Sequence, residues 1–220
     1  MRVEFKELKN DKIGIFYPCA KFDNRIRVDK NKTIELELNF IKPFVTAPML
    51  TDDGLSWENS YAICPYIQGS KKPIPKDDLR KLAPLIYNYL DSIDNELGNG
   101  SRFNKRVQNF DEKYGILRVG SYTWSNEFVC IRDNTKLAPN HISAIKTAWG
   151  VEETPLFDNH ISYVSEVVDN KKIKYISKKE ARYILEKLKD SDVNEIIINS
   201  QDSRSISSRL PIKIERFKQN

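Results

Sequence analysis

The chain has 220 residues, of which 40% are hydrophobic and 10% aromatic, and its formal net charge is +5 at pH 7. A chain of this length can bury roughly 70% of its unfolded surface, and its aromatic content argues against disorder. No stretch approaches the ~20 apolar residues that a membrane span needs, and the charged first residues predict no secretory leader. The mild positive charge permits a polyanionic partner without requiring one.

The first half of the sequence predicts strands. Residues 13–17 form a short apolar run that we expect to end at Pro18, and residues 34–38 alternate as a half-buried strand does. Two prolines interrupt the apolar residues 40–50, which predicts a bent extended segment rather than a central strand. Residues 61–66 are typical of a buried strand.

A helix is predicted between Pro75 and Gly98. Asp77 or Asp78 is the expected N-cap, and Pro84 should open the main helix after a short first turn. Apolar residues then recur at steps of three and four along one stripe, which is the pattern of an amphipathic helix: Leu82, Leu85, Ile86, Tyr89, Leu90, Ile93 and Leu97.

The second half continues with strands and one more helix. Residues 114–119 and 127–132 are the expected strands on either side of a loop, and residues 161–168 and 172–176 should form a hairpin. Ser177 and Glu180 have the spacing of a capping box, which predicts a helix start.

The whole pattern predicts an α+β fold with mostly antiparallel sheets and two main helices. We expect a single domain over residues 1–220, with a possible subdivision near 133–150.

Several catalytic motifs are missing from the sequence. It contains no phosphate loop, no GxGxxG, no GxSxG and no zinc-protease or zinc-deaminase signature. Cys19, Cys64 and Cys130 are too widely spaced for a disulfide framework, which favours a reducing cytoplasm. A cysteine paired with His141 or His160 could be a nucleophile, but a lone cysteine is more often a small buried residue.

One enzymatic alternative remains open. Asp158, Asp169 and Lys171 have a spacing permitted in Mg²⁺-dependent PD-(D/E)xK nucleases, in which two acids hold the metal and a lysine steadies the attacking water. The competing interpretation is that Asp169 and Lys171 merely form the predicted hairpin turn.

Six segments of the sequence follow one another in an order that resembles a known family. They are IELELNFIKPFVTAPML (34–50), YAICPY (61–66), LRKLAPLIYNYLDSIDNELGNGSRFNKR (79–106), YGILRVGSYTWS (114–125), FDNHISYVSE (157–166) and the segment 180–217, in which a helix leads to a Ser/Arg loop and a last strand. In this order they resemble the target-recognition domain of adenine-specific DNA methyltransferases and of type IIG restriction–modification enzymes.

The resemblance implies recognition of a specific sequence in double-stranded DNA without catalysis. The (N/D)PP(Y/F/W) motif and the glycine-rich S-adenosylmethionine site of such methyltransferases are missing from the sequence. The chain would therefore be the specificity part of a restriction–modification system in the cytoplasm. A methyltransferase or endonuclease partner would supply catalysis, S-adenosylmethionine and Mg²⁺.

Basic and aromatic residues that cluster in the sequence are the predicted DNA contacts. Cations and hydroxyls bind phosphates, and exposed aromatics and polar groups reach bases. A solvated basic face, and a core position for Trp124, are the competing interpretations. The predicted phosphate contacts are Lys71, Lys72, Arg102, Arg106, Arg204, Ser205 and Arg209, and the predicted base contacts are Arg118, Ser121, Tyr122, Trp124, Ser125 and Asn126.

Overall fold

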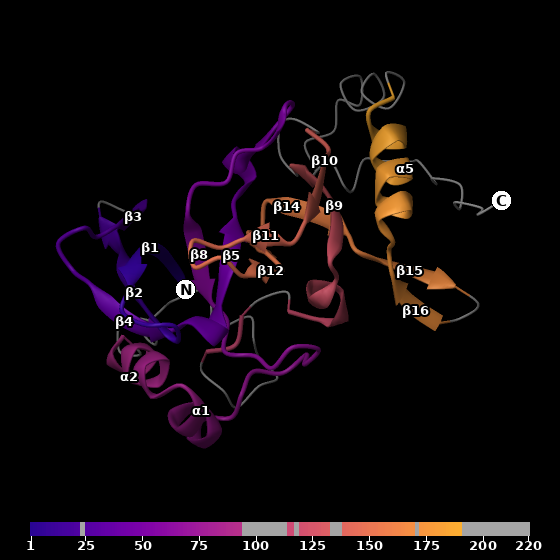
Figure 1. Cartoon of the computed structure of the whole chain (residues 1–220). Helices are drawn as coiled ribbons and strands as arrows, with labels where there is room; N and C mark the ends of the chain where they lie inside the picture. The colour runs from indigo at the N-terminus through magenta and orange to yellow at the C-terminus, as the bar shows by residue number, and fades with distance from the viewer. Residues whose placement is uncertain (23–24, 94–113, 117–118, 133–137, 170–171, 191–220) are drawn as a thin grey trace. The chain divides into compact units, whose positions relative to one another are not determined.

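The computed structural model describes residues 1–22, 25–93, 114–116, 119–132, 138–169 and 172–190. Helices and mostly antiparallel sheets in these ranges confirm the α+β class (Figure 1). The chain forms two compact units. Unit 1 comprises Met1–Phe44, Asn59–Trp124 and Lys146–Leu156, and unit 2 comprises Val45–Glu58, Ser125–Ile145 and Phe157–Asn220. One passage between the units, at Ile145, falls inside the window predicted for a subdivision.

Unit 1 is built on an antiparallel sheet. Its strands run in the order β13-β5-β8-β1-β2-β3, and β4 also pairs with β2. The bounds are β1 Arg2–Leu8, β2 Ile13–Phe22, β3 Arg25–Val28, β4 Ile34–Glu37, β5 Ile41–Val45, β8 Ser60–Ile63 and β13 Leu156–Phe157; a short η1, Leu38–Phe40, separates β4 from β5.

Aromatic rings fill the core beneath this sheet. The Tyr61 and Trp149 ring centroids lie 4.9 Å apart, and those of Phe5 and Phe16 lie 5.5 Å apart in an edge-to-face arrangement. The Tyr61 hydroxyl accepts a hydrogen bond from the Ala148 backbone N–H at 2.9 Å. This bond ties the segment around Trp149 to the middle of the sheet, although that segment is far away in sequence.

Two prolines lie inside strands, against expectation. The strand β2 continues through Pro18, which faces Val3 of β1. The segment predicted to be bent and non-central contains the interior strand β5, in which Pro43 faces Tyr61 of β8. On one side of β5 the neighbouring strand is β13, which is only two residues long. Most of that side of β5 therefore resembles a sheet edge, where the N–H group that proline lacks is not needed.

The predicted helix is two helices. α1, Lys76–Leu82, and α2, Pro84–Ser92, are separated at Ala83, whose φ of −144° is not helical. A residue before proline is pushed out of the helical region, so Pro84 opens α2 as predicted. The break shifts the phase of the apolar stripe and leaves Leu82 56% exposed. No Asp side chain caps α1, which begins after Pro75, so that part of the prediction was wrong.

An acidic side chain from the sheet caps α2. The Glu37 carboxylate accepts the backbone N–H groups of Leu85 at 2.8 Å and Ile86 at 2.9 Å. These N–H groups have no partner within the helix, and a negative charge there is favourable. The bonds fix α2 beside β4 (Figure 1).

Unit 2 is built on a three-stranded sheet of order β10-β9-β14. Its central strand is the predicted one at 127–132. The elements of unit 2 are η2 Ala47–Met49, β6 Leu50–Thr51, β7 Gly54–Leu55, β9 Glu127–Arg132, β10 Asn140–Ser143, β14 Ile161–Val164, β15 Glu166–Asp169, β16 Lys172–Tyr175 and α5 Lys178–Leu188. The short strand β11, Ile145–Lys146, lies where the chain passes from unit 2 to unit 1, and it pairs with β12, Glu152–Glu153, of unit 1.

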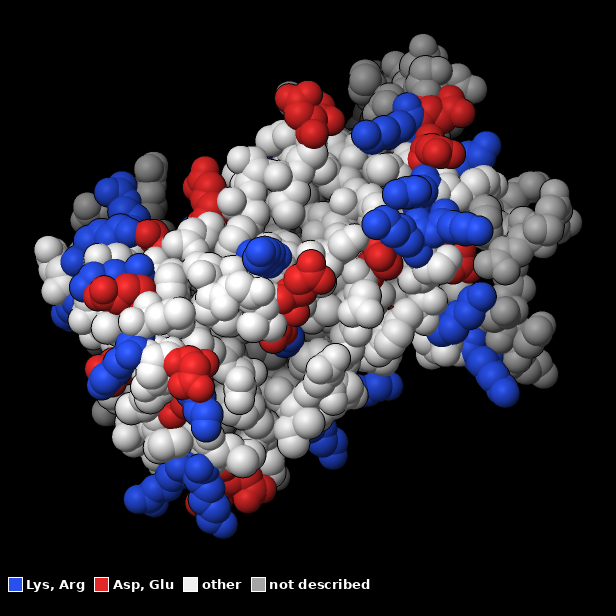
Figure 2. Space-filling model, viewed as in Figure 1, with Lys and Arg blue, Asp and Glu red and all other residues white. Residues whose placement is uncertain are grey.

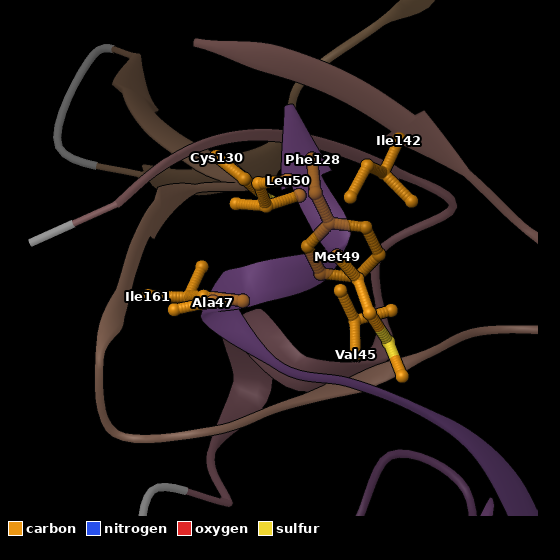
Figure 3. Packing of buried hydrophobic residues seen from close by; sticks show 8 residues of the cluster. All are labelled: Val45, Ala47, Met49, Leu50, Phe128, Cys130, Ile142 and Ile161. Atoms are coloured by element: carbon orange, nitrogen blue, oxygen red, sulfur yellow. The ribbon is translucent and has the colours of Figure 1, made fainter. Parts of the chain in front are cut away.

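Both faces of β9 are covered, because its side chains alternate between two apolar clusters. Phe128 and Cys130 belong to the first cluster, which Figure 3 shows gathered around the Phe128 ring: Val45, Ala47, Met49, Leu50, Phe128, Cys130, Ile142 and Ile161. Val129 and Ile131 belong to the second, in which α5 contributes Ala181 and Leu188.

The predicted hairpin is partly confirmed. The strands β15 and β16 pair with Asp169 opposite Lys172. Residues 161–164, however, form the separate strand β14, which pairs with β9. The capping box that starts α5 is confirmed: the Glu180 N–H donates to Ser177 Oγ and the Ser177 N–H to Glu180 Oε2. The predicted elements at residues 94–100 and after residue 190 lie outside the described residues.

Candidate nucleic-acid interface

The structure describes seven of the predicted DNA contacts. Lys71, Lys72 and the residues Ser121, Tyr122 and Trp124 belong to unit 1, whereas Ser125 and Asn126 belong to unit 2. The other predicted contacts lie outside the described residues: Arg102, Arg106, Arg118, Arg204, Ser205 and Arg209.

The two lysines lie on an exposed turn with a well-defined backbone. Gly69 has a φ of +85°, which glycine adopts without strain. The Ser70 hydroxyl donates to the Lys72 carbonyl at 2.7 Å, and the Lys72 N–H donates to Ser70 Oγ at 3.0 Å. Both lysine side chains are exposed. The turn thus presents two adjacent positive charges to solvent.

The buried side chain of Trp124 holds this turn in place. Its indole N–H donates to the Ser70 carbonyl at 2.9 Å, and its ring packs with Ala62, Cys64 and Leu156. The side chain is only 5% exposed. The prediction that Trp124 stacks on DNA bases is therefore corrected. The structure agrees with the alternative, a core position, because the indole ring is buried among apolar side chains.

The positive charge of Lys42, close to the Trp124 ring, is neutralised by an acidic partner within the protein. The Lys42 ammonium is 5.5 Å from the centroid of the Trp124 ring, and it binds Glu153 Oε2 at 2.6 Å and Thr154 Oγ1 at 3.3 Å. The Lys42 side chain is 12% exposed. A buried lysine needs such partners, and Lys42 is thus a structural cation rather than a candidate phosphate contact.

The predicted loop at 121–126 is more compact than expected. Ser121–Trp124 forms a 3-10 turn, η3, in which the Gly120 N–H donates to Thr123 Oγ1 at 3.0 Å. A Cβ atom on Gly120 would lie 2.5 Å from the Tyr122 ring, so any other residue here would force that ring to move. Described residues 114–116 and 119 contain no strand.

Asn126 is the one exposed residue of this loop, 121–126, all of which the structure describes. Ser121 and Tyr122 are half-buried. Ser125 is buried, and its hydroxyl donates to the Glu127 carbonyl at 2.9 Å. Its predicted role as a base contact is therefore corrected to that of a turn-forming residue. In unit 1, the exposed amide of Gln68 lies in the same turn as the two lysines; the sequence prediction missed it.

The two buried cysteines, Cys64 and Cys130, are unsuited to nucleophilic catalysis. Burial raises the pKa of the Cys64 thiol to about 12 and raises that of Cys130 well above its ordinary value. A thiolate is the reactive form, so both thiols are neutral near pH 7. All three cysteines are free.

His141 has an acidic partner. Its Nε2 lies 2.5 Å from Glu127 Oε2, and the Ser143 hydroxyl donates to the same oxygen at 2.9 Å. A serine nucleophile needs its hydroxyl on the histidine, whereas here the carboxylate lies between the two. The cluster agrees with the prediction that His141 is a polar structural residue.

The alternative nuclease residues are only partly described. Asp158 accepts backbone N–H groups from Ala47 at 3.1 Å and from His160 at 2.9 Å, and it thereby organises a turn in unit 2. The side chain of Asp169 and all of Lys171 lie outside the description. Among the side chains that are described, no three His, Cys, Asp or Glu residues gather closely enough to hold a metal ion.

Within the described ranges, no helix is both long and apolar enough to cross a membrane. No family model matches the sequence, and no curated protein matches it either.

Proposed function

We propose that the chain binds double-stranded DNA and recognises a short sequence as the non-catalytic specificity part of a restriction–modification system. In this proposal an adenine methyltransferase or endonuclease domain or subunit carries out the chemistry. S-adenosylmethionine and Mg²⁺ belong to that partner. The order of the six sequence segments supports the family assignment, and the cationic turn of unit 1 supports the binding of a polyanion.

The turn at Lys71 and Lys72 is the observation on which DNA binding rests. Most of the affinity of a protein for DNA comes from cations placed against phosphates. Two lysines on a turn held by Ser70 and Trp124 lose little backbone entropy when they bind. Lysines on a freely moving loop would lose more.

In this proposal, exposed polar side chains recognise the sequence of the DNA. An Asn or Gln amide can form two hydrogen bonds with the N6 and N7 positions of adenine in the major groove. Gln68 and Asn126 are both exposed and are our candidates among the described residues. Arg118, which could bind guanine in the same bidentate way, remains a candidate from the sequence.

Selection from a random duplex library tests the proposal. The purified chain should enrich a consensus sequence. The double variant K71Q/K72Q should weaken binding to consensus and random duplexes by the same factor, because phosphate contacts carry no sequence information. The matched control is K12Q/K32Q, which removes the same charge from exposed lysines elsewhere in unit 1 and should change little.

Two results would contradict the proposal. One is the absence of any enriched sequence together with no binding to duplex DNA. The other is cleavage of supercoiled plasmid by the chain and Mg²⁺ alone that is abolished by Asp169→Ala, which would support the nuclease alternative.

A further inference from the structure

A second cationic surface lies in unit 2, on one flank of α5. Lys178, Arg182 and Lys189 are all exposed and are spaced by four and seven residues, so they share one side of the helix. Figure 2 shows Lys and Arg side chains gathered over α5. We call these three residues the α5 stripe.

The orientation of the α5 stripe is fixed by the buried side of the helix that adjoins it. Ala181 and Leu188 are buried against Val129 and Ile131 of β9, with Ile184 and Leu185 packed beside them. The capping box at Ser177 fixes where the helix begins. The three cations are therefore held on a rigid support.

Within the part of the chain that the structure describes, the α5 stripe forms no ion pair. Among the described residues, no carboxylate lies within 4.0 Å of the three cationic groups, whereas Lys9, Lys30 and Lys76 of unit 1 each form an ion pair. Glu186 lies one turn after Arg182 but does not pair with it in the described structure. The acidic residues that the structure describes thus leave the charge of the stripe uncompensated.

Helix stability does not account for these residues. A cation in the first turn, such as Lys178, opposes the helix dipole at a cost of about 0.3–1 kcal/mol. Like charges four residues apart, such as Lys178 and Arg182, repel each other by roughly 0.2–0.5 kcal/mol. Only Lys189, at the C-cap, is placed favourably. A polyanionic ligand would relieve both penalties.

We infer that the α5 stripe binds the sugar–phosphate backbone of duplex DNA, an inference that rests on the proposed function. From Lys178 to Lys189 the helix rises roughly 16 Å, at 1.5 Å per residue. This is longer than the ~12 Å width of the major groove, so the ends of the stripe can reach phosphates on both sides of it.

The stripe holds the backbone and does not read bases. Two of its three residues are lysines, whose ammonium groups bind phosphates as point charges, and the side of α5 that carries Ala181 and Leu188 is covered by the sheet. The same covering argues against an anionic membrane as the ligand, because a helix that lies on a membrane buries an apolar face in it.

Fluorescence anisotropy with a labelled duplex, titrated at several KCl concentrations, tests the inference. The variant K178Q/R182Q/K189Q should reduce the steepness of log K against log [KCl] by up to about 2.7, because each lost phosphate contact contributes roughly 0.9. The loss should be the same for all sequences. The control K12Q/K32Q/K81Q removes three exposed charges from unit 1 and should leave the slope unchanged.

The outcomes separate the two proposals. If the wild-type chain binds DNA and the stripe variant binds with an unchanged slope, the stripe inference is wrong while the proposed function stands. If the wild-type chain does not bind duplex DNA, both the proposed function and the stripe inference are wrong. The single variant R182Q, which cannot disturb the core, should reduce the slope by about 0.9 and guards against misfolding of the triple variant. Equal competition by anionic vesicles would also overturn the inference.

Discussion

At the scale of single residues, the sequence identified important positions but not their orientation. Trp124 stood out in a polar loop, and both a base-stacking role and a core role were compatible with that context. The difference depends on Ser70 and Leu156, which contact the ring from distant parts of the chain. The Lys42–Glu153 ion pair spans 111 residues, and no local pattern marks it.

Replacing Trp124 with Phe tests its role as the support of the cationic turn. The variant loses the hydrogen bond to the Ser70 carbonyl and part of the buried ring, so the free energy of unfolding should fall by about 2 kcal/mol. Urea denaturation measures this change. Affinity for DNA should fall modestly for every sequence alike, since the lysines remain. Unchanged stability, together with an altered sequence preference, would show that Trp124 contacts bases after all.

At the scale of elements, the local signal at the start of α5 was confirmed, whereas contacts between segments distant in the sequence could not be predicted. The capping box at Ser177 predicted the start of α5, because its two partners are three residues apart. The cap of α2 could not be predicted, because Glu37 lies 48 residues before the N–H group that it accepts. Pro43 was misleading for a similar reason: whether a proline fits a strand depends on the neighbouring strand.

Replacing Glu37 with Ala tests the long-range cap. Two N–H groups at the start of α2 would lose a charged acceptor, and capping substitutions typically cost about 0.5–2 kcal/mol. We expect a loss near the upper end in urea denaturation, because both carboxylate oxygens are used. Glu35→Ala is the matched control, since Glu35 forms an exposed ion pair with Lys9 and such pairs contribute little. Equal stability of the two variants would contradict the capping role.

At the scale of the whole molecule, the sequence predicted the fold class but not the organisation. We expected a single domain with a possible subdivision near 133–150, and the chain passes between two compact units at Phe44, Glu58, Trp124, Ile145 and Leu156. Apart from the passage at Ile145, which falls inside that window, these passages carry no Pro/Gly-rich linker, so composition could not reveal them. The consequence for function is that each unit carries its own described cationic surface, Lys71 and Lys72 in unit 1 and the α5 stripe in unit 2.

The salt dependence of duplex binding by the wild-type chain tests the central claim most directly. Five described cations, namely Lys71, Lys72 and the α5 stripe, should together give a slope of log K against log [KCl] of about −4.5 or steeper, at roughly −0.9 per phosphate. Fluorescence anisotropy titrations at several KCl concentrations between about 50 and 200 mM measure this slope. A slope shallower than about −1, or no binding at the lowest salt concentration, would contradict the account.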